Sequence, residues 1–151
     1  MLRLTKKADY GLIALMHLAG KEAGRSASAK EIADAYRIPL PLLAKVLQRL
    51  AREGFLASVY GTNGGYKLAR DAGRISALEV IRAIDGPVFL TSCSSLEHDC
   101  HQTAKCTARG PLEKIREDIL RLLDGITISE MSAGGGRETP LVTLTAMRTR
   151  A

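Results

Sequence analysis

Aromatic residues are scarce in this chain: only 4% of its 151 residues are Phe, Trp or Tyr, and tryptophan is absent. Hydrophobic residues nevertheless make up 46% of the sequence, so the core must be aliphatic. An aliphatic core favours helices with short strands over a β-sandwich. At this length we expect one domain, or one small domain with an appendage.

Long hydrophobic runs and an export signal are also missing. The most apolar stretch, residues 11–20, is too short to span a bilayer and contains His17. No helix expected in the basic half combines a cationic face with bulky aromatics, as a helix lying on a membrane would. We therefore expect a cytoplasmic protein with no membrane partner.

Acidic residues are few in the first half of the chain. Residues 1–70 carry 12 Lys or Arg against 5 Asp or Glu, whereas residues 71–151 carry 10 against 11. The net charge of +6 is therefore concentrated in the first half. This asymmetry predicts that the first half binds an anionic partner, nucleic acid above all.

The order of elements in residues 1–86 is that of a winged helix-turn-helix. Apolar residues at helical spacing predict helices at residues 6–22, 28–36, 39–53 and 76–84. The apolar stripe of the third helix is predicted to contain Leu40, Leu43, Ala44, Leu47, Leu50 and Ala51. Thr5 is a suitable N-cap for the first helix, and Ser76 with Glu79 forms a capping box before the last. Two strands, residues 55–60 and 66–69, flank a glycine-rich turn.

The exposed side of the third predicted helix carries the donors that a recognition helix presents to the major groove. The start of the first helix and the wing add further polar groups for the DNA backbone. The residues predicted to contact double-stranded DNA are Lys6, Lys7, Pro41, Leu42, Lys45, Gln48, Arg49, Arg52, Tyr60, Thr62 and Asn63. The alternative is an ordinary solvated helix face. The glycine-rich turn lacks the G-x-x-x-x-G-K-[ST] pattern, so a nucleotide site is not expected.

The only cysteines are Cys93, Cys100 and Cys106, separated by six and by five residues. An odd number of clustered thiols favours metal or redox chemistry over structural disulfides. The short C-x₂₋₄-C pairs of zinc sites and the C-x-x-C pair of thiol oxidoreductases are both missing. The spacing fits a loop around a larger group, such as an iron–sulfur cluster. Zinc, a disulfide switch and inert cysteines are the alternatives, and His98 and His101 are local candidates for a fourth ligand.

Pro111 opens a further predicted helix after the cysteine loop. Its apolar stripe is Leu112, Ile115, Ile119 and Leu122. A helix with so much apolar surface, separated from the main module, predicts a homodimer, although it could instead pack on its own domain. The predicted organisation is a DNA-binding domain at 1–86, a cysteine loop at 87–110, a dimerisation helix at 111–131 and a flexible, glycine-rich tail at 132–151. The fold class is therefore mainly α with a small β-hairpin.

Several segments resemble the IscR/NsrR/RirA group of winged-helix regulators. They are Met1-Leu2-Arg3-Leu4-Thr5-Lys6, Leu56-Ala57-Ser58-Val59, Gly64-Gly65-Tyr66, Ala77-Leu78-Glu79-Val80-Ile81 and the three-cysteine loop. The resemblance covers about residues 1–131, and the opening also resembles regulators of the SUF assembly operon. It implies a homodimeric DNA-binding regulator that carries a 2Fe–2S or 4Fe–4S cluster. Such regulators control iron–sulfur assembly, iron homeostasis or responses to nitric oxide and redox state.

The same resemblance implies a set of cluster ligands. The cluster cysteines of the group correspond to Cys93, Cys100 and Cys106, with a first interval one residue longer than the common five. The IscR type takes its fourth ligand from a His at the position of Arg109 here, which departs from that pattern. The NsrR type uses an Asp of the partner subunit near the start of helix one, where this chain has Asp9. The resemblance thus favours 4Fe–4S over 2Fe–2S, although a carboxylate interacting with the helix dipole explains Asp9 equally well.

Together these observations predict a homodimeric transcriptional regulator that is not an enzyme and has no small-molecule substrate. Loss or oxidation of the cluster would reposition the cysteine loop and change the affinity for operator DNA. The alternative is a winged-helix regulator with zinc or a thiol switch in place of a cluster.

Overall fold

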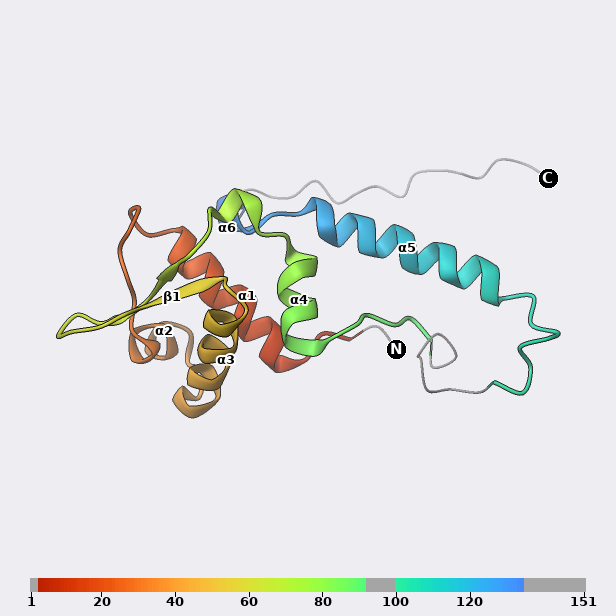
Figure 1. The fold of residues 1–151 in the computed structure, drawn as a ribbon, viewed down its shortest axis with the longest axis horizontal. Helices are drawn as coiled ribbons and strands as arrows, with labels where there is room; N and C mark the ends of the chain where they lie inside the picture. Colours follow the sequence, from red (N-terminus) through yellow and green to blue (C-terminus); the bar gives the residue numbers. More distant parts are fainter. Residues whose placement is uncertain (1–2, 92–99, 135–151) are drawn as a thin grey trace.

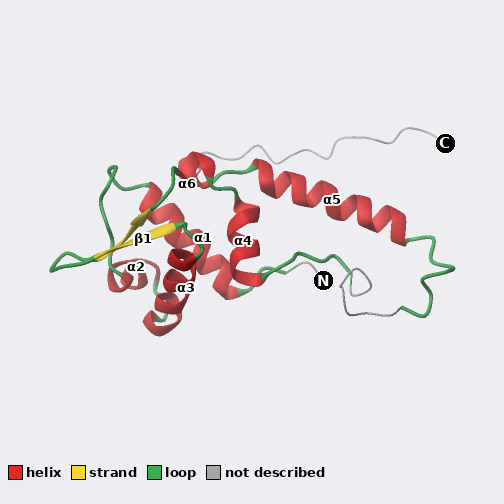
Figure 2. Cartoon of the chain, viewed as in Figure 1, coloured by secondary structure: helices red, strands yellow, loops and turns green. Residues whose placement is uncertain are grey.

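The computed structural model describes residues 3–91 and 100–134. Across these two ranges the chain forms six α-helices, one short 3-10 helix and a two-stranded antiparallel sheet (Figures 1 and 2). The predicted fold class, mainly α with a small β-hairpin in a winged helix-turn-helix, is confirmed. Cys93 and His98 lie outside the described residues, as does most of the predicted tail.

The helix-turn-helix is built by α1 (Lys6–Ala19), α2 (Ala29–Tyr36) and α3 (Leu40–Arg52). Thr5 caps α1 as predicted, because its hydroxyl accepts a hydrogen bond of 3.2 Å from the Ala8 N–H. The prediction that this helix reaches residue 22 is wrong. Gly20, a poor helix former, is its C-cap. Arg37 ends α2 in the left-handed region at φ 53°, which turns the chain into α3.

The buried face of α3 is formed by Leu43, Val46, Leu47 and Leu50. The predicted stripe missed Val46 and included Leu40, which is 41% exposed in the first turn of the helix. Pro39 is the N-cap and Pro41 lies in the first turn, where a missing N–H breaks no helical hydrogen bond. The buried face packs on α1 and α2, so the polar side of α3 is left toward solvent.

The wing consists of β1 (Leu56–Val59), which is shorter than predicted, and β2 (Gly65–Leu68), which has the predicted length but begins one residue earlier. Ala27 extends this sheet, since it exchanges two backbone hydrogen bonds of 2.9 and 2.8 Å with Tyr66. A Cβ atom on Gly65 would lie 2.2 Å from the Ala27 carbonyl oxygen. Glycine is therefore required at position 65 by the close approach of the Ala27 backbone.

The capping box predicted for α4 (Ala77–Asp85) is present. The Ser76 hydroxyl accepts from the Glu79 N–H at 3.1 Å, and the Glu79 carboxylate accepts from the Ser76 N–H at 2.9 Å. This helix packs against α1, α3 and α5. Its last residue is followed by Gly86 at φ 82°, where the chain leaves the winged helix and enters the cysteine loop.

The long helix α5 (Arg109–Gly125) begins two residues before Pro111 and extends away from the winged helix (Figure 1). The prediction of one helix over 111–131 is wrong, because the chain is extended at Ile126. A separate helix, α6 (Ile128–Ala133), then starts with a capping box between Thr127 and Glu130. Two of the residues assigned to the tail by prediction, at positions 132 and 133, are therefore helical.

The short helix α6 returns to the winged helix rather than continuing α5. It packs against α1 and against the 3-10 helix η1 (Ala72–Arg74), and Ile128 is fully buried. The Ile128 N–H donates to the Ile75 carbonyl at 2.9 Å, and the Ala77 N–H donates to the Ile126 carbonyl at 2.8 Å. Among the helices in the described part of the chain, none combines the length and apolarity needed to cross a membrane.

Candidate nucleic-acid interface and cysteine loop

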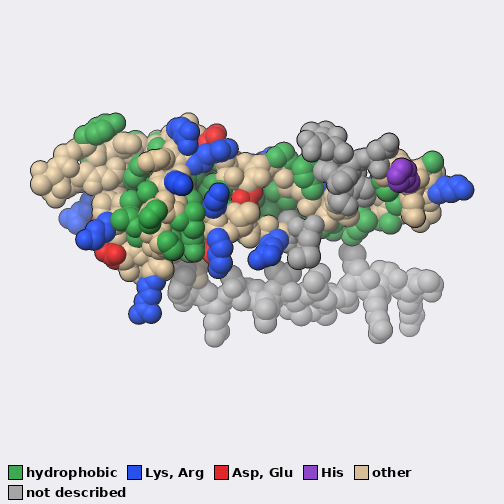
Figure 3. All heavy atoms as spheres, turned by 90° about the horizontal axis from the view of Figure 1, so that it is seen from below, with side chains coloured by type: hydrophobic (Ala, Val, Ile, Leu, Met, Phe, Trp, Pro, Cys, Tyr) green, Lys and Arg blue, Asp and Glu red, His purple; other side chains and the backbone are tan. Residues whose placement is uncertain are grey.

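The structure brings several of the predicted DNA-contacting residues around one open hollow between α1, α3 and α4. We call it the cationic hollow, and its lining is Lys7, Leu42, Lys45, Val46, Arg49, Arg52 and Ile84. Four of these side chains are Lys or Arg, one from α1 and three from α3. Viewed from below, Lys and Arg side chains are spread over the winged-helix end of the molecule (Figure 3). Four cations around one hollow create a positive potential suited to phosphate groups.

The remaining predicted DNA residues lie outside this hollow. Pro41 and Gln48 are exposed on α3, and Lys6 is exposed at the start of α1. Tyr60, 93% exposed, follows β1, and Thr62 with Asn63 forms the tip of the hairpin. The hairpin projects to one side of the helices in Figure 1. The wing and the recognition helix therefore offer two separate polar surfaces. Two such surfaces are needed to contact neighbouring grooves of a DNA duplex.

The tip of the wing is held by the segment before α2. The Ser26 hydroxyl donates a hydrogen bond of 3.2 Å to the Asn63 carbonyl. Lys21, which follows α1, donates a hydrogen bond to Glu31 in the first turn of α2. This bond lowers the pKa of the Glu31 carboxyl below its ordinary value. These contacts fix the position of the wing and of the helix that supports α3.

Arg49 differs from the other cations of the hollow because its guanidinium bonds within the protein. Its Nε donates a hydrogen bond of 3.0 Å to the Ala83 carbonyl in the last turn of α4, and lies 3.4 Å from Glu53 Oε1. The side chain is still 51% exposed. Sequence alone could not reveal this link, because it joins residues 34 positions apart.

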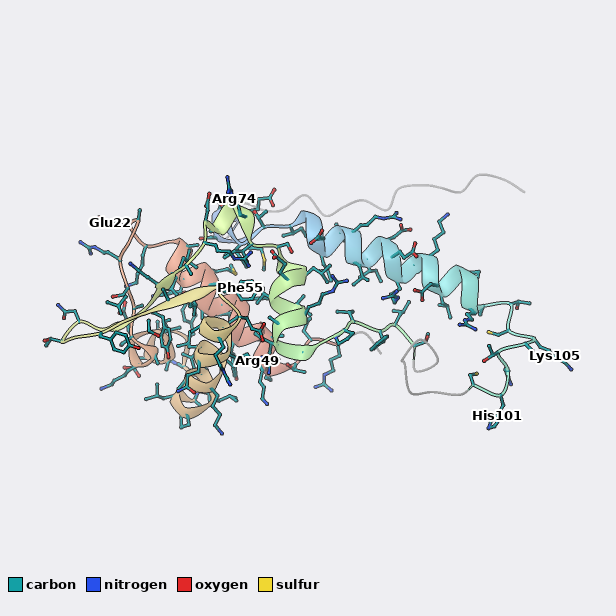
Figure 4. All side chains as sticks on the ribbon, in the orientation of Figure 1. Glu22, Arg49, Phe55, Arg74, His101 and Lys105 are labelled. Atoms are coloured by element: carbon teal, nitrogen blue, oxygen red, sulfur yellow. The ribbon has the colours of Figure 1, made fainter. Side chains whose placement is uncertain are left out.

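The cysteine loop connects α4 to α5, and its residues 87–91 and 100–108 contain no helix or strand. Cys100 is half-buried and Cys106 is exposed, and both thiols are free. The Cys100 carbonyl accepts two hydrogen bonds from Thr103, one from its N–H at 3.0 Å and one from its hydroxyl at 2.6 Å. Figure 4 shows His101 and Lys105 at the end of the molecule remote from the winged helix. Residues 100–106 thus contain a turn that leaves the Cys100 thiol partly accessible and the Cys106 thiol exposed.

Free thiols are the ligands that iron–sulfur clusters and zinc prefer, so the residue chemistry of the loop fits such a group. Among residues 3–91 and 100–134 there is no group of three or more His, Cys, Asp or Glu side chains placed to hold a metal ion. That finding does not include Cys93. Asp9 is exposed in the first turn of α1, whereas His101 and Lys105 lie beyond α5 at the far end of the molecule (Figure 4). Among the described residues, one chain therefore does not bring Asp9 to the turn that holds His101 and Lys105.

The helix α5 is apolar on two sides. One side packs against α4, where Leu120 is 9% exposed. On the other side Ile115 and Leu122 are 48% and 64% exposed. Arg116 bonds to Glu113 at 2.5 Å and lowers the pKa of the Glu113 carboxyl, which fixes one polar edge of the helix. The second apolar side has no cover within the described part of this chain.

A winged helix-turn-helix whose recognition helix carries a cationic face defines a DNA-binding regulator. The Rrf2 family, described as iron-dependent transcriptional regulators, matches residues 4–134, and the chain belongs to this family. The protein is therefore a transcriptional regulator and not an enzyme. The resemblance to winged-helix iron–sulfur regulators observed in the sequence is confirmed at the level of the family.

Solved structures agree with this assignment. The chain is 26% identical to CymR of B. subtilis, described as the global cysteine regulator, with 88% of this chain and 98% of that chain covered and a TM-score of 0.74. It is 29% identical to IscR of T. potens, with 86% and 85% covered and a TM-score of 0.67. An oxidised form of CymR from Staphylococcus aureus is 27% identical, with 86% and 95% covered and a TM-score of 0.69.

Proposed function

We propose that the protein is a homodimeric regulator that binds operator DNA and responds to an iron–sulfur cluster held by Cys93, Cys100 and Cys106. The observation that supports this function best is the pair of free thiols of Cys100 and Cys106 in the loop of a chain from a family described as iron-dependent. The loop joins the last helix of the DNA-binding unit to the exposed helix α5. A change in the loop can therefore act on both.

The proposed DNA surface has three parts. The start of α3 meets base edges in the major groove, the cations beside it meet phosphates, and the wing meets the neighbouring minor groove or backbone. In that order the proposed contacts are Pro41 and Leu42; the cations Lys6, Lys7, Lys45 and Arg52 together with the neutral amide of Gln48; and Tyr60, Thr62 and Asn63. Arg49 lines the same hollow and is bonded to the Ala83 carbonyl of α4. The cationic hollow supports the second part most directly, because it gathers four cations from two helices.

The proposed dimer forms through the exposed apolar side of α5. Ile115 and Leu122 lie seven residues apart on one side of the helix, which is the spacing of two helical turns. A symmetric pair of such helices buries both side chains of each protomer. The dimer would present two recognition helices to one operator, so the operator would contain two half-sites related by two-fold symmetry.

The fourth cluster ligand in this proposal is Asp9 of the partner subunit. The separation within one chain between Asp9 and the turn that holds His101 and Lys105 supports a ligand supplied across the dimer. His98 and His101 are the alternatives within the loop, and 4Fe–4S is favoured over 2Fe–2S. When bound, the cluster supplies a charged, redox-active group at the thiols. A tenfold change in operator affinity requires about 1.4 kcal/mol of coupling between the loop and the DNA surface.

A second candidate function is a regulator whose thiols are oxidised directly, or bind zinc, without a cluster. The similarity to CymR of B. subtilis, named a cysteine regulator, and to the oxidised CymR of S. aureus favours it. Exposure of Cys106 would allow such chemistry, since thiol oxidation depends on access.

Metal and acid-labile sulfide analysis of protein purified without oxygen separates the two candidates. Iron and sulfide in comparable amounts, with broad visible absorption, are expected for the cluster regulator. Cys100→Ala should lose both while keeping the helical circular dichroism of the parent. Zinc, or no metal in the parent protein, would reject the cluster and favour the second candidate. Visible absorption unchanged in Cys100→Ala would reject Cys100 as a ligand.

A further inference from the structure

Three helices of the DNA-binding unit meet at the last turn of α4, residues 83–85. From α1, the Thr5 N–H and hydroxyl donate to the Asp85 carboxylate at 3.1 and 2.5 Å. From α3, Arg49 donates to the Ala83 carbonyl. Between them Ile84 packs so tightly that a Cβ on Gly11 would lie 2.3 Å from its Cδ1. The start of α1 and the recognition helix are thus both fastened to this turn.

The bond from Arg49 satisfies a group that the helix itself leaves unpaired. The carbonyl groups in the last turn of a helix have no partner four residues on, and they carry the negative end of the helix dipole. At the end of α4 the Arg82 carbonyl accepts from Gly86, and the Ala83 carbonyl accepts from Arg49. A guanidinium at this position gains both a hydrogen bond and a favourable dipole interaction. Glu53, four residues after Arg49 on α3, holds the side chain in this orientation.

We propose that Arg49 is a positioning residue, which fastens the recognition helix to the end of α4, and that it is not a primary phosphate ligand. The cysteine loop begins directly after this turn, at Gly86. Any displacement of the end of α4 by the loop is therefore passed to α3 through Arg49. The transmission of a displacement from the loop to α3 rests on the proposed function, whereas the positioning role of Arg49 does not depend on a cluster. Figure 4 shows Arg49 between α3 and α4.

The charge and the geometry of Arg49 can be separated by conservative substitution. A lysine keeps the positive charge and can contact a phosphate, but it has no Nε–H at the guanidinium position. Arg74, exposed in η1 and outside the cationic hollow, provides the control for replacing a guanidinium with an ammonium group. The probe is a DNA duplex selected by the parent protein from a random library, titrated with metal-free protein.

If Arg49 is a positioning residue, Arg49→Lys should weaken duplex binding about three- to tenfold, while Arg74→Lys should bind like the parent. The slope of log affinity against log salt should be unchanged in Arg49→Lys, because the number of phosphate contacts is unchanged. Parental affinity in Arg49→Lys would overturn the positioning role, as would a slope reduced by about 0.9. If the parent protein selects no duplex from the random library, DNA binding by this surface is rejected.

The transmission step is tested by the ratio of operator affinities before and after the cluster is removed with a chelator. In Arg49→Lys this ratio should move toward one, with visible absorption of the loaded protein equal to that of the parent. A ratio as large as that of the parent would overturn transmission through Arg49. If the ratio of affinities is one in the parent protein, cluster sensing and transmission are both rejected. The affinity of Arg49→Lys for the selected duplex would still decide the positioning role.

Discussion

Replacing Leu122 by alanine should weaken the dimer strongly and leave the fold of each protomer intact. Leu122 is 64% exposed, so the isolated chain loses little packing. Complete burial of a leucine side chain is worth about 1.5–3 kcal/mol, and the exposed part beyond the β-carbon that alanine keeps is worth about 1 kcal/mol. Two-fold symmetry removes the side chain twice, so the dimer should lose about 2 kcal/mol, or about 30-fold in its dissociation constant.

Sedimentation velocity over a dilution series measures this change directly. Lys114→Ala, on the polar side of the same helix, is the control and should dissociate like the parent. Circular dichroism should be the same for all three proteins. A parent protein that sediments as a monomer at every concentration would refute dimerisation through α5. An unchanged dissociation constant in Leu122→Ala would place the interface elsewhere.

Three further predictions test packing, capping and DNA binding. Gly11→Ala should lower the free energy of unfolding by about 1 kcal/mol in urea, since overpacking against Ile84 costs about 1–3 kcal/mol and exceeds the helix-propensity gain of about 1 kcal/mol; higher stability would mean that Ile84 simply rotates away. Hydrogen bonds from Thr127 lower the pKa of Glu130, so its stabilisation is complete above the unfolded pKa and is lost as pH falls through the lower folded value. Glu130→Gln should therefore be less stable than the parent at pH 7 and equal to it in acid, and a difference that persists in acid would exclude the carboxylate as its source. Lys45→Ala should weaken operator binding and reduce the salt slope by about 0.9, whereas an unchanged slope would remove Lys45 from the phosphate contacts.

Features decided by a few neighbouring residues could be predicted from the sequence. The caps at Thr5 and Ser76 depend on side chains within three positions of the bond they make, and both are present. The cationic side of α3 followed from helical periodicity in the same way. Lys7 was predicted as a DNA contact, but its place in the same hollow as the cations of α3 depends on how α1 packs on α3, which the sequence alone did not indicate.

The errors arose where tertiary contacts override local pattern. One helix over 111–131 was predicted from the sequence, whereas the structure has α5 and α6. The chain instead breaks at Ile126, because backbone pairing with Ile75 and Ala77 draws it back to the winged helix. The link from Arg49 to Ala83 was missed for the same reason, since nothing local to α3 indicates a partner on α4.

The return of α6 to the winged helix has a consequence for biosynthesis. Ile128 is fully buried in the core shared with α1, and the Ser132 hydroxyl bonds to the Met16 carbonyl across 116 positions of sequence. A ribosome has therefore synthesised the cysteine loop and all of α5 before the core of the DNA-binding unit can close. Nascent chains that end before α6 expose the apolar surface that Ile128 covers, and such surfaces recruit chaperones. The thiols of the loop thus leave the ribosome before the unit they are proposed to control is complete.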